Sequence, residues 1–278
     1  MKARIDLHLH TTCSDGVRTP QEIVEMVRQR GLVAFAIADH DTIAGYELAR
    51  ELLGSNDAEL VPAVELSCSG DNVDLHMLGY CFDPASEILD AALVEFRKRR
   101  NQRGLKMVEK LGGLGVGIGY DEVARCAGSA PVGRPHVAQA LFEAGVVDSY
   151  DMAFQKYIGD RGPAYVPKAN MEPAEAIEII HRSGGVAVLA HPMINHTYDH
   201  LDMLVEVGLD GVEVWHPEHR ISDTDRLKHM AEKHDLLITG GSDYHGRPGR
   251  YGSVGSEPVR LEILERLKQA VRDKRGTR

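Results

Sequence analysis

Two histidines near the start of the chain have the spacing of a pair of metal ligands. They lie in the stretch D-L-H-L-H-T-T-C-S-D-G, residues 6–16, which carries His8, His10 and, five residues later, Asp15. Side chains at positions i and i+2 of a β-strand point to the same face. If residues 3–10 form a strand, both imidazoles therefore converge on one point. Such a pair also occurs by coincidence, so the rest of the chain has to decide.

Imidazole and carboxylate side chains recur where other predicted strands end. Apolar, β-branched runs predict strands at residues 3–9, 33–38, 60–64, 73–79, 186–190, 211–214 and 236–239. The groups at or just beyond these strands are His8, His10, Asp15, His40, Glu65, His76, His191, Asp243 and His245. Each one alone is more typical of a loop residue or a surface charge. Nine of them at six strand ends favour one shared site. Asp39 and Asp41, which flank His40, are interpreted as helix caps, Asp41 above all.

Helical patterns alternate with the strands and predict an α/β fold. They cover residues 20–30, 43–53, 173–182, 200–207, 224–233 and 263–272. This alternation is typical of parallel strands. Seven strands suit a closed barrel of the TIM type, one unit short, better than an open sheet. Reactive groups of such barrels collect at the C-terminal ends of the strands, which agrees with where the nine side chains fall.

Residues 84–165 interrupt the alternation. A long helical pattern at 86–111 is followed by the glycine-rich L-G-G-L-G-V-G-I-G and by further short helices. We therefore expect a barrel built from residues 1–83 and 166–278, with residues 84–165 as a helical insertion that caps the active site.

The nine side chains are too many for one metal ion. A catalytic Zn²⁺ takes three protein ligands and keeps an open position. Nine ligands suit two or three divalent ions with one or two bridging carboxylates. Imidazole and carboxylate without thiolate favour Zn²⁺, Mn²⁺ or Fe²⁺, with Mn²⁺ expected foremost. Centres with several ions polarise a phosphoryl group and generate hydroxide from water.

The chain resembles the polymerase and histidinol phosphatase (PHP) family of the amidohydrolase superfamily in six motifs between residues 6 and 245. They are D-L-H-L-H-T-T-C-S-D-G, I-A-D-H-D-T, V-E-L-S, L-H-M-L-G-Y, L-A-H-P and G-S-D-Y-H. The resemblance implies a distorted (β/α)7 barrel that hydrolyses phosphate esters. It also implies three ion positions: His8, His10, Glu65 and Asp243; Glu65, His76 and His191; Asp15, His40 and His245. The complete ligand set implies an active enzyme, with His191 and Asp243 essential for catalysis, and argues against a non-catalytic metal-binding or polymerase-interaction module.

Two further motifs resemble bacterial stand-alone nucleotide phosphoesterases. They are G-R-P-H-V-A at 133–138 and Y-I-G-D-R-G-P-A-Y-V-P at 157–167. That branch includes 3′,5′-nucleoside bisphosphate phosphatases, which the chain resembles most, and 5′-to-3′ exoribonucleases. We therefore predict removal of the 3′-phosphate from 3′,5′-bisphosphonucleotides, such as adenosine 3′,5′-bisphosphate. The alternatives are exoribonuclease action on short 5′-phosphorylated RNA and hydrolysis of a small amino-alcohol phosphate.

Basic residues in the insertion are candidates for binding the substrate. Arg134 precedes Pro135 at a predicted helix start, where free N–H groups favour an anion. His136 could contact the same phosphate or protonate the leaving oxygen. On the helical run R-K-R-R-N-Q-R, Arg99, Arg100 and Arg103 share one side that could grip a second phosphate. The competing interpretations are a plain helix cap and a solvated face. Trp215 and His216 either line the base or sugar or, for Trp215, only cap the barrel.

The bulk composition sets outer limits. The chain has 278 residues, 43% hydrophobic residues and a formal net charge of −10. This charge argues against a broad basic face that coats nucleic acid, although a local basic pocket is compatible with it. No run reaches 18 apolar residues, so no membrane span is expected. The four cysteines show no paired spacing, and the N-terminus leaves no room for a signal peptide. We expect a cytoplasmic enzyme with a nucleotide substrate and no stable protein partner.

Overall fold

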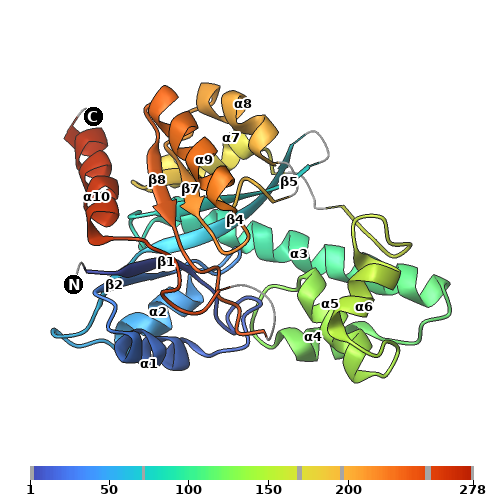
Figure 1. Ribbon diagram of the computed structural model, residues 1–278. Coiled ribbons are helices and arrows are strands. Elements are labelled where there is room, and N and C mark those ends of the chain that lie inside the picture. The colour runs from blue at the N-terminus through green and yellow to red at the C-terminus, as the bar shows by residue number, and fades with distance from the viewer. Residues whose placement is uncertain (1–2, 71–72, 168–170, 195–196, 248–251, 277–278) are drawn as a thin grey trace.

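Two sheets form the strand-bearing part of the molecule (Figure 1). The computed structural model describes residues 3–70, 73–167, 171–194, 197–247 and 252–276. The first sheet, in the order β1-β2-β3, contains β1 (Ile5–Leu9), β2 (Ala34–Ile37) and β3 (Glu59–Val61). The second, in chain order, contains β4 (Ala63–Gly70), β5 (Val73–Tyr80), β6 (Val186–Leu189), β7 (Gly211–Trp215) and β8 (Leu237–Gly240).

Short backbone bridges join the two sheets on both sides. His40 pairs with Glu65, where the Asp41 N–H donates to the Glu65 carbonyl at 3.0 Å. On the other side Leu9 pairs with Tyr244, and the His10 N–H donates to the Tyr244 carbonyl at 3.0 Å. The prediction of an α/β fold is confirmed. The strand pairing itself is that of two bridged sheets, so the closed barrel stays a prediction.

The expectation of parallel strands is wrong for β5. This strand is antiparallel to both β4 and β6, whereas the other pairs are parallel. Only two residues separate β4 from β5, and a parallel pair needs a crossover of a dozen residues or more. The strand predicted at 60–64 is also two strands. Pro62, which has no N–H for a ladder, separates β3 from the longer β4.

Helices flank the sheets close to where they were predicted. They are α1 (Pro20–Arg30), α2 (Ala44–Glu51), α7 (Pro173–Arg182), the short η2 (Thr197–His200), α8 (Leu201–Glu206), α9 (Ile221–Lys233) and α10 (Leu261–Gly276). Helix α1 begins with a capping box in which Thr19 and Glu22 bond each other's backbone N–H groups. Helix α2 instead has Ile43 at its N-cap, and no side chain of the described residues makes a capping hydrogen bond there. The prediction that Asp41 caps it is therefore wrong.

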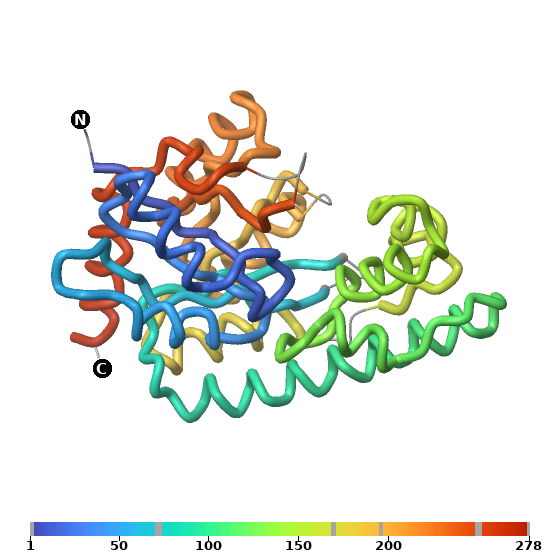
Figure 2. The backbone as a smooth tube through the Cα atoms, turned by 90° about the horizontal axis from the view of Figure 1, so that it is seen from below, coloured from blue at the N-terminus to red at the C-terminus, as the bar shows by residue number. Residues whose placement is uncertain are grey.

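The segment that interrupts the alternation of strands and helices consists of helices. It comprises α3 (Glu87–Gly113), α4 (Tyr120–Ala127), α5 (Arg134–Glu143), α6 (Tyr150–Ala153) and the single π-turn η1 (Phe154–Ile158). The first half of α3 packs Leu89 and Phe96 on the core beneath the sheets, whereas its second half packs Met107 and Leu111 against α4 and α5. Figure 2 shows that α3 extends from the strand-bearing part of the molecule to the other helices of the insertion. Division of the chain into domains at 84 and 165 stays a prediction. Among the described helices, none is both long enough and apolar enough to cross a membrane.

Candidate metal centre

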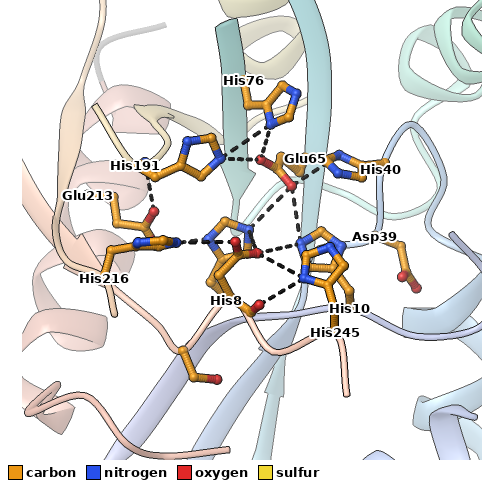
Figure 3. Close-up of polar contacts among 12 residues, drawn as sticks. His8, His10, Asp39, His40, Glu65, His76, His191, Glu213, His216 and His245 are labelled. Carbon is orange, nitrogen blue, oxygen red and sulfur yellow. Dashed lines mark hydrogen bonds and ion pairs between the residues drawn. The ribbon is translucent and has the colours of Figure 1, made fainter. Parts of the chain in front are cut away.

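The nine predicted side chains lie together, and Figure 3 labels the histidines and Glu65 among them. We call them the histidine–carboxylate cluster: His8, His10, Asp15, His40, Glu65, His76, His191, Asp243 and His245. His76 and His191 are half-buried, and the other seven are buried. The tertiary structure thus brings together residues that lie up to 237 positions apart, as predicted. The strand-end argument does not hold for Glu65 and His76, which lie within β4 and the antiparallel β5.

Glu65 is central to the cluster because its two oxygens face different histidines. Its Oε1 lies 2.7 Å from His76 Nδ1 and 3.0 Å from His191 Nε2. Its Oε2 lies 3.1 Å from His40 Nδ1 and 3.2 Å from His10 Nε2. A carboxylate that offers one oxygen to each of two ligand groups has the geometry needed to bridge two ions.

The other two carboxylates face the remaining histidines. Asp243 Oδ1 lies 3.1 Å from His10 Nε2, and Asp15 Oδ1 lies 3.2 Å from His245 Nε2. Three groups of donor atoms emerge: His8, His10 and Asp243; His10, Asp15, His40 and His245; His40, Glu65 and His76. These groups are similar to the three ion positions that the family resemblance implies, with three differences. His10 and His40 are shared between groups, Glu65 is absent from the group of His8 and Asp243, and His191 adjoins the third group through Glu65 and His76.

The chemistry of these atoms fits divalent cations. The ring atoms His10 Nε2 and His40 Nδ1 are buried close to carboxylate oxygens, yet neither makes a hydrogen bond within the described residues. Atoms that aim at one point without bonding each other are arranged like ligands of a common ion. Burial lowers the pKa of His10, but Asp243 and Glu65 outweigh that effect and raise the pKa to about 10. In the absence of an ion, the carboxylates therefore retain a proton on the ring.

Two buried aspartates hold the loops that carry the cluster. Asp6 accepts hydrogen bonds from the Ser242 N–H at 3.0 Å and the Gly255 N–H at 2.7 Å. Asp39 accepts from the Thr11 N–H at 2.7 Å and from the Ser14 hydroxyl at 2.5 Å. The interpretation of Asp39 as a helix cap is therefore wrong, since it fixes the loop between His10 and Asp15. Two positions of the cluster are also strained, because His191 and Asp243 have φ values of 29° and 45°.

Arg100 reaches from α3 to the edge of the cluster. Its Nε donates to Asp41 Oδ2, and its Nη2 donates to the Ser67 hydroxyl at 2.7 Å. Asp41, with φ 54°, also accepts the Ser67 N–H at 2.7 Å. Asp41 follows His40, and Ser67 lies two residues beyond Glu65, so the guanidinium ties the insertion to both. The Arg100 guanidinium therefore joins the insertion to the strands, in addition to the phosphate contact that the sequence predicts.

The hydrogen bonds of His136 disagree with its predicted role. The Gly133 N–H donates to its Nδ1 at 3.0 Å, and its Nε2–H donates to the Ser14 carbonyl at 2.9 Å. Burial lowers its pKa, so the ring is neutral. Neither nitrogen is left for a phosphate or for a leaving oxygen. We correct the expectation: His136 joins the start of α5 to the loop that carries Asp15.

A cavity of about 440 Å³ opens over the cluster. Four of its lining residues are arginines, which we call the arginine wall: Arg100, Arg103, Arg134 and Arg247. Tyr150 and Phe154 of the insertion also line it. Arg103 is only 9% exposed, and its Nε donates to the Val166 carbonyl at 2.7 Å. Its Nη2 is buried and has no hydrogen-bond partner in the described residues. Burial and the nearby Arg134 lower the pKa of Arg103 to about 10.

Several residues of this region escaped the sequence argument. Glu213 on β7 is fully buried and contacts His8 and His191, and Glu218 and Arg247 line the cavity. In V-E-V the charged residue alternates with valines, a signal that one face of β7 is polar. Trp215 packs against the apolar cores of the strands, which supports its interpretation as a cap. His216 faces Asp243, with its Nε2 3.2 Å from Asp243 Oδ2, instead of a base or sugar.

The fold and the cluster together define a metallohydrolase of the α/β class. Residues 6–158 match the PHP domain family. The chain therefore belongs to the PHP domain family, and it is a metal-dependent phosphoesterase.

Relatives with similar sequence identity to this chain are named for different activities. A 5′-3′ exoribonuclease of Haemophilus influenzae is 32% identical, covering 88% of this chain and 91% of its own. A phosphoribosyl 1,2-cyclic phosphate 1,2-diphosphodiesterase of Eggerthella lenta is 34% identical, over 90% and 97%. A 3′,5′-nucleoside bisphosphate phosphatase of Chromobacterium violaceum is 31% identical, over 90% of each chain. These identities are too close to choose between the activities.

A solved structure confirms the fold. The crystal structure from Bifidobacterium adolescentis, of a protein described as a metal-dependent phosphoesterase, is 34% identical and covers 95% of both chains. Its TM-score with this chain is 0.87. The two chains therefore share one fold over nearly their whole lengths.

Proposed function

We propose that this phosphoesterase removes the 3′-phosphate from 3′,5′-bisphosphonucleotides, as in the conversion of adenosine 3′,5′-bisphosphate to AMP and phosphate. One observation carries the proposal. The same 440 Å³ cavity opens onto the histidine–carboxylate cluster and is also lined by the buried Arg103, whose Nη2 has no hydrogen-bond partner among the residues that the structure describes. An unpaired buried guanidinium N–H is costly, and an anion would satisfy it. The cavity thus offers one site for a reacting phosphate and another for a remote one.

The cluster is proposed to hold two or three divalent ions, with Mn²⁺ foremost and Zn²⁺ or Fe²⁺ as alternatives. When bound, such ions supply stabilisation of the phosphoryl oxygens and lower the pKa of a water molecule. The nine side chains are the proposed ligands, with His191 and Asp243 essential for catalysis. His216 holds Asp243 Oδ2 and thereby leaves Oδ1 directed at His10.

The arginine wall is proposed to orient the substrate. Arg134 lies at the first position of α5 and is tied to Asp74 and Asp160. Arg103 lies beside it, close enough that Arg134 affects its pKa. A phosphate held there would fix the distance of the second phosphate from the cluster. Such remote binding lowers the barrier only if it positions the reacting group. A substrate with a single phosphate would lose this contribution.

The two sheets are proposed to form a distorted (β/α)7 barrel. If β3 and β4 count as one unit, seven units follow one another, and the proposed ring would close through the bridges at His40–Glu65 and Leu9–Tyr244. Residues 84–165 then act as a cap, because the insertion supplies Arg103, Arg134 and Tyr150 to the cavity above the cluster.

A second candidate activity is 5′-to-3′ exoribonuclease action on short 5′-phosphorylated RNA. The relatives' names support it equally, because a nucleoside bisphosphate, RNA and a phosphoribosyl cyclic phosphate all combine ribose with more than one phosphate. Tyr150 and Phe154 line the cavity beside Arg247, and aromatic rings with a basic groove suit single-stranded nucleic acid.

A substrate panel tests the proposal. Purified enzyme is assayed with adenosine 3′,5′-bisphosphate, 5′-phosphorylated oligoribonucleotides, phosphoribosyl 1,2-cyclic phosphate, and sugar and amino-alcohol monophosphates. We expect the bisphosphate to have the highest kcat/KM and AMP to be cleaved poorly. Higher kcat/KM for oligoribonucleotides would replace the proposal with the second candidate.

Variants of the wall separate anchoring from reaction. Arg134→Ala should reduce transition-state binding of the bisphosphate by about 2–4 kcal/mol, the range for truncated charged pairs, while a monophosphate is affected much less. Arg125→Ala is the matched control, since Arg125 is an exposed insertion arginine that pairs with Glu143. Equal loss with every substrate would mean that Arg134 serves the reacting phosphate instead.

A further inference from the structure

Glu213 is a fully buried carboxylate that contacts the cluster without belonging to it. It lies at the centre of β7 and has 0% exposure. Its Oε1 lies 2.9 Å from His8 Nδ1, and its Oε2 accepts the backbone N–H of His191 at 2.8 Å. Figure 3 shows it below His191 and to the left of His8, on the side away from Glu65. Burial of a carboxylate is unfavourable unless it is paired, so this position calls for an explanation.

The first contact determines which nitrogen of His8 can face the cluster. A carboxylate can only accept a hydrogen bond, so the His8 proton is held on Nδ1. Nε2 faces the cluster, 3.3 Å from Glu65 Oε2 and 3.4 Å from Asp243 Oδ1, so its lone pair becomes available to an ion once any proton shared with Glu65 leaves. A carboxylate on the far nitrogen also makes an imidazole a stronger ligand.

The second contact supports a strained backbone. His191 has a φ of 29°, a value that L-residues rarely adopt. Its N–H is bonded to Glu213, and its ring places Nε2 3.0 Å from Glu65 Oε1. The two Glu213 oxygens therefore reach two different sides of the cluster, because His8 groups with Asp243 and His191 adjoins Glu65 and His76.

We propose that Glu213 is a positioning residue that prepares both sides of the cluster for divalent ions, by setting the tautomer of His8 and by holding the backbone of His191. The inference rests on the proposed ligand roles of the cluster, and it adds a residue that is not itself a ligand. It predicts that the loss of one carboxylate weakens more than one ion position.

The amide isostere is a sharp test because both partners of Glu213 are donors. Glutamine has one accepting oxygen, so its NH₂ group must face either the His8 Nδ1–H or the His191 N–H. Glu213→Gln therefore keeps the shape of the side chain and loses one of the two hydrogen bonds together with the charge. Val214→Ala is the matched control, because Val214 is an equally buried neighbour on the opposite face of β7, in the core beneath the helices.

The experiment measures Mn²⁺ binding by the full-length enzyme. Wild type, Glu213→Gln and Val214→Ala are titrated with Mn²⁺, and the free ion is followed by electron paramagnetic resonance. We expect Glu213→Gln to weaken binding by about 10- to 100-fold, the range for partners of metal-ligating histidines, and Val214→Ala to change it less than twofold. At limiting Mn²⁺ the Gln variant should lose kcat while KM is retained, and excess Mn²⁺ should restore kcat.

A measurement on the wild type covers the case in which the variant does not fold. In the Zn²⁺-loaded enzyme, ¹H–¹⁵N NMR of the histidine rings should find His8 protonated at Nδ1 only. A His8 without that proton, or a folded Glu213→Gln with wild-type Mn²⁺ affinity, would overturn the inference alone. A wild type that binds fewer than two ions would overturn the proposed cluster roles and the inference with them.

Discussion

The contact between Asp41 and Arg100 makes a strong prediction about how the insertion is coupled to the cluster. The Asp41 side chain is 0% exposed and that of Arg100 is 16% exposed. Removal of one partner of a buried ion pair leaves an uncompensated charge, which costs about 3–5 kcal/mol. Because Asp41 still accepts the Ser67 N–H, the loss should be near the lower end of this range. We expect Arg100→Met to lower the free energy of unfolding by about 3 kcal/mol.

The reverse change should be milder. Asp41→Asn preserves an acceptor for the Ser67 N–H, and asparagine tolerates the φ of 54°. Arg100 would still donate to the Ser67 hydroxyl, so we expect a loss of about 1–2 kcal/mol. The double variant contains neither buried charge. It should lose about 1–2 kcal/mol, less than Arg100→Met alone, which gives a coupling energy of about 2–4 kcal/mol.

Urea unfolding of the chelator-treated protein measures these free energies without a contribution from ion binding. Lys98→Met is the control, because Lys98 is an exposed residue on the same helix and should contribute about 0.5 kcal/mol or less. Activity provides the second readout. If Arg100 acts through Asp41, both single variants lower kcat/KM. Strictly additive free energies, or full activity of Asp41→Asn with an inactive Arg100→Met, would refute the reasoning and leave Arg100 as a plain phosphate ligand.

Three other predictions concern the cluster directly. Elemental analysis should find about two to three ions of the Mn/Fe/Zn class per chain, and a chelator should abolish activity; one ion with full activity would contradict the cluster of several ions. Mn²⁺ affinity should rise by up to about tenfold per pH unit between pH 6 and 8, because the pKa of His10 is raised to about 10 and its proton must leave; a flat profile would contradict this. Gly241→Ala should weaken Mn²⁺ binding, because a Cβ at this position would lie 2.3 Å from His8 Cβ. Gly112→Ala is the control and should not weaken it, because a Cβ there meets no atom of the described residues within 4 Å. Equal effects of the two variants on Mn²⁺ binding would refute the steric argument.

The sequence by itself determined the elements whose signals are local. Helix α1 begins and ends at its predicted residues because Thr19, Glu22 and Pro20 define its start, and Gly31 adopts the left-handed conformation at its end. The grouping of the nine cluster residues was also predictable. Most of them lie near or beyond the end of a strand, where strand direction places them at one edge. Glu65 and His76 instead lie within β4 and β5. These arguments need only the chain immediately around each residue.

Only the tertiary structure decided the contacts between distant segments. Asp41 resembles a helix cap in sequence, but the N–H of Ser67 and the guanidinium of Arg100 compete for it in the folded chain. Glu213 looks like any polar residue in a strand until β1 and β6 bring His8 and His191 to its two oxygens. His136 was predicted to meet substrate, yet Ser14, 122 residues away, occupies its Nε2. Which partner satisfies a buried polar group depends on packing between segments, and no local pattern of residues carries that information.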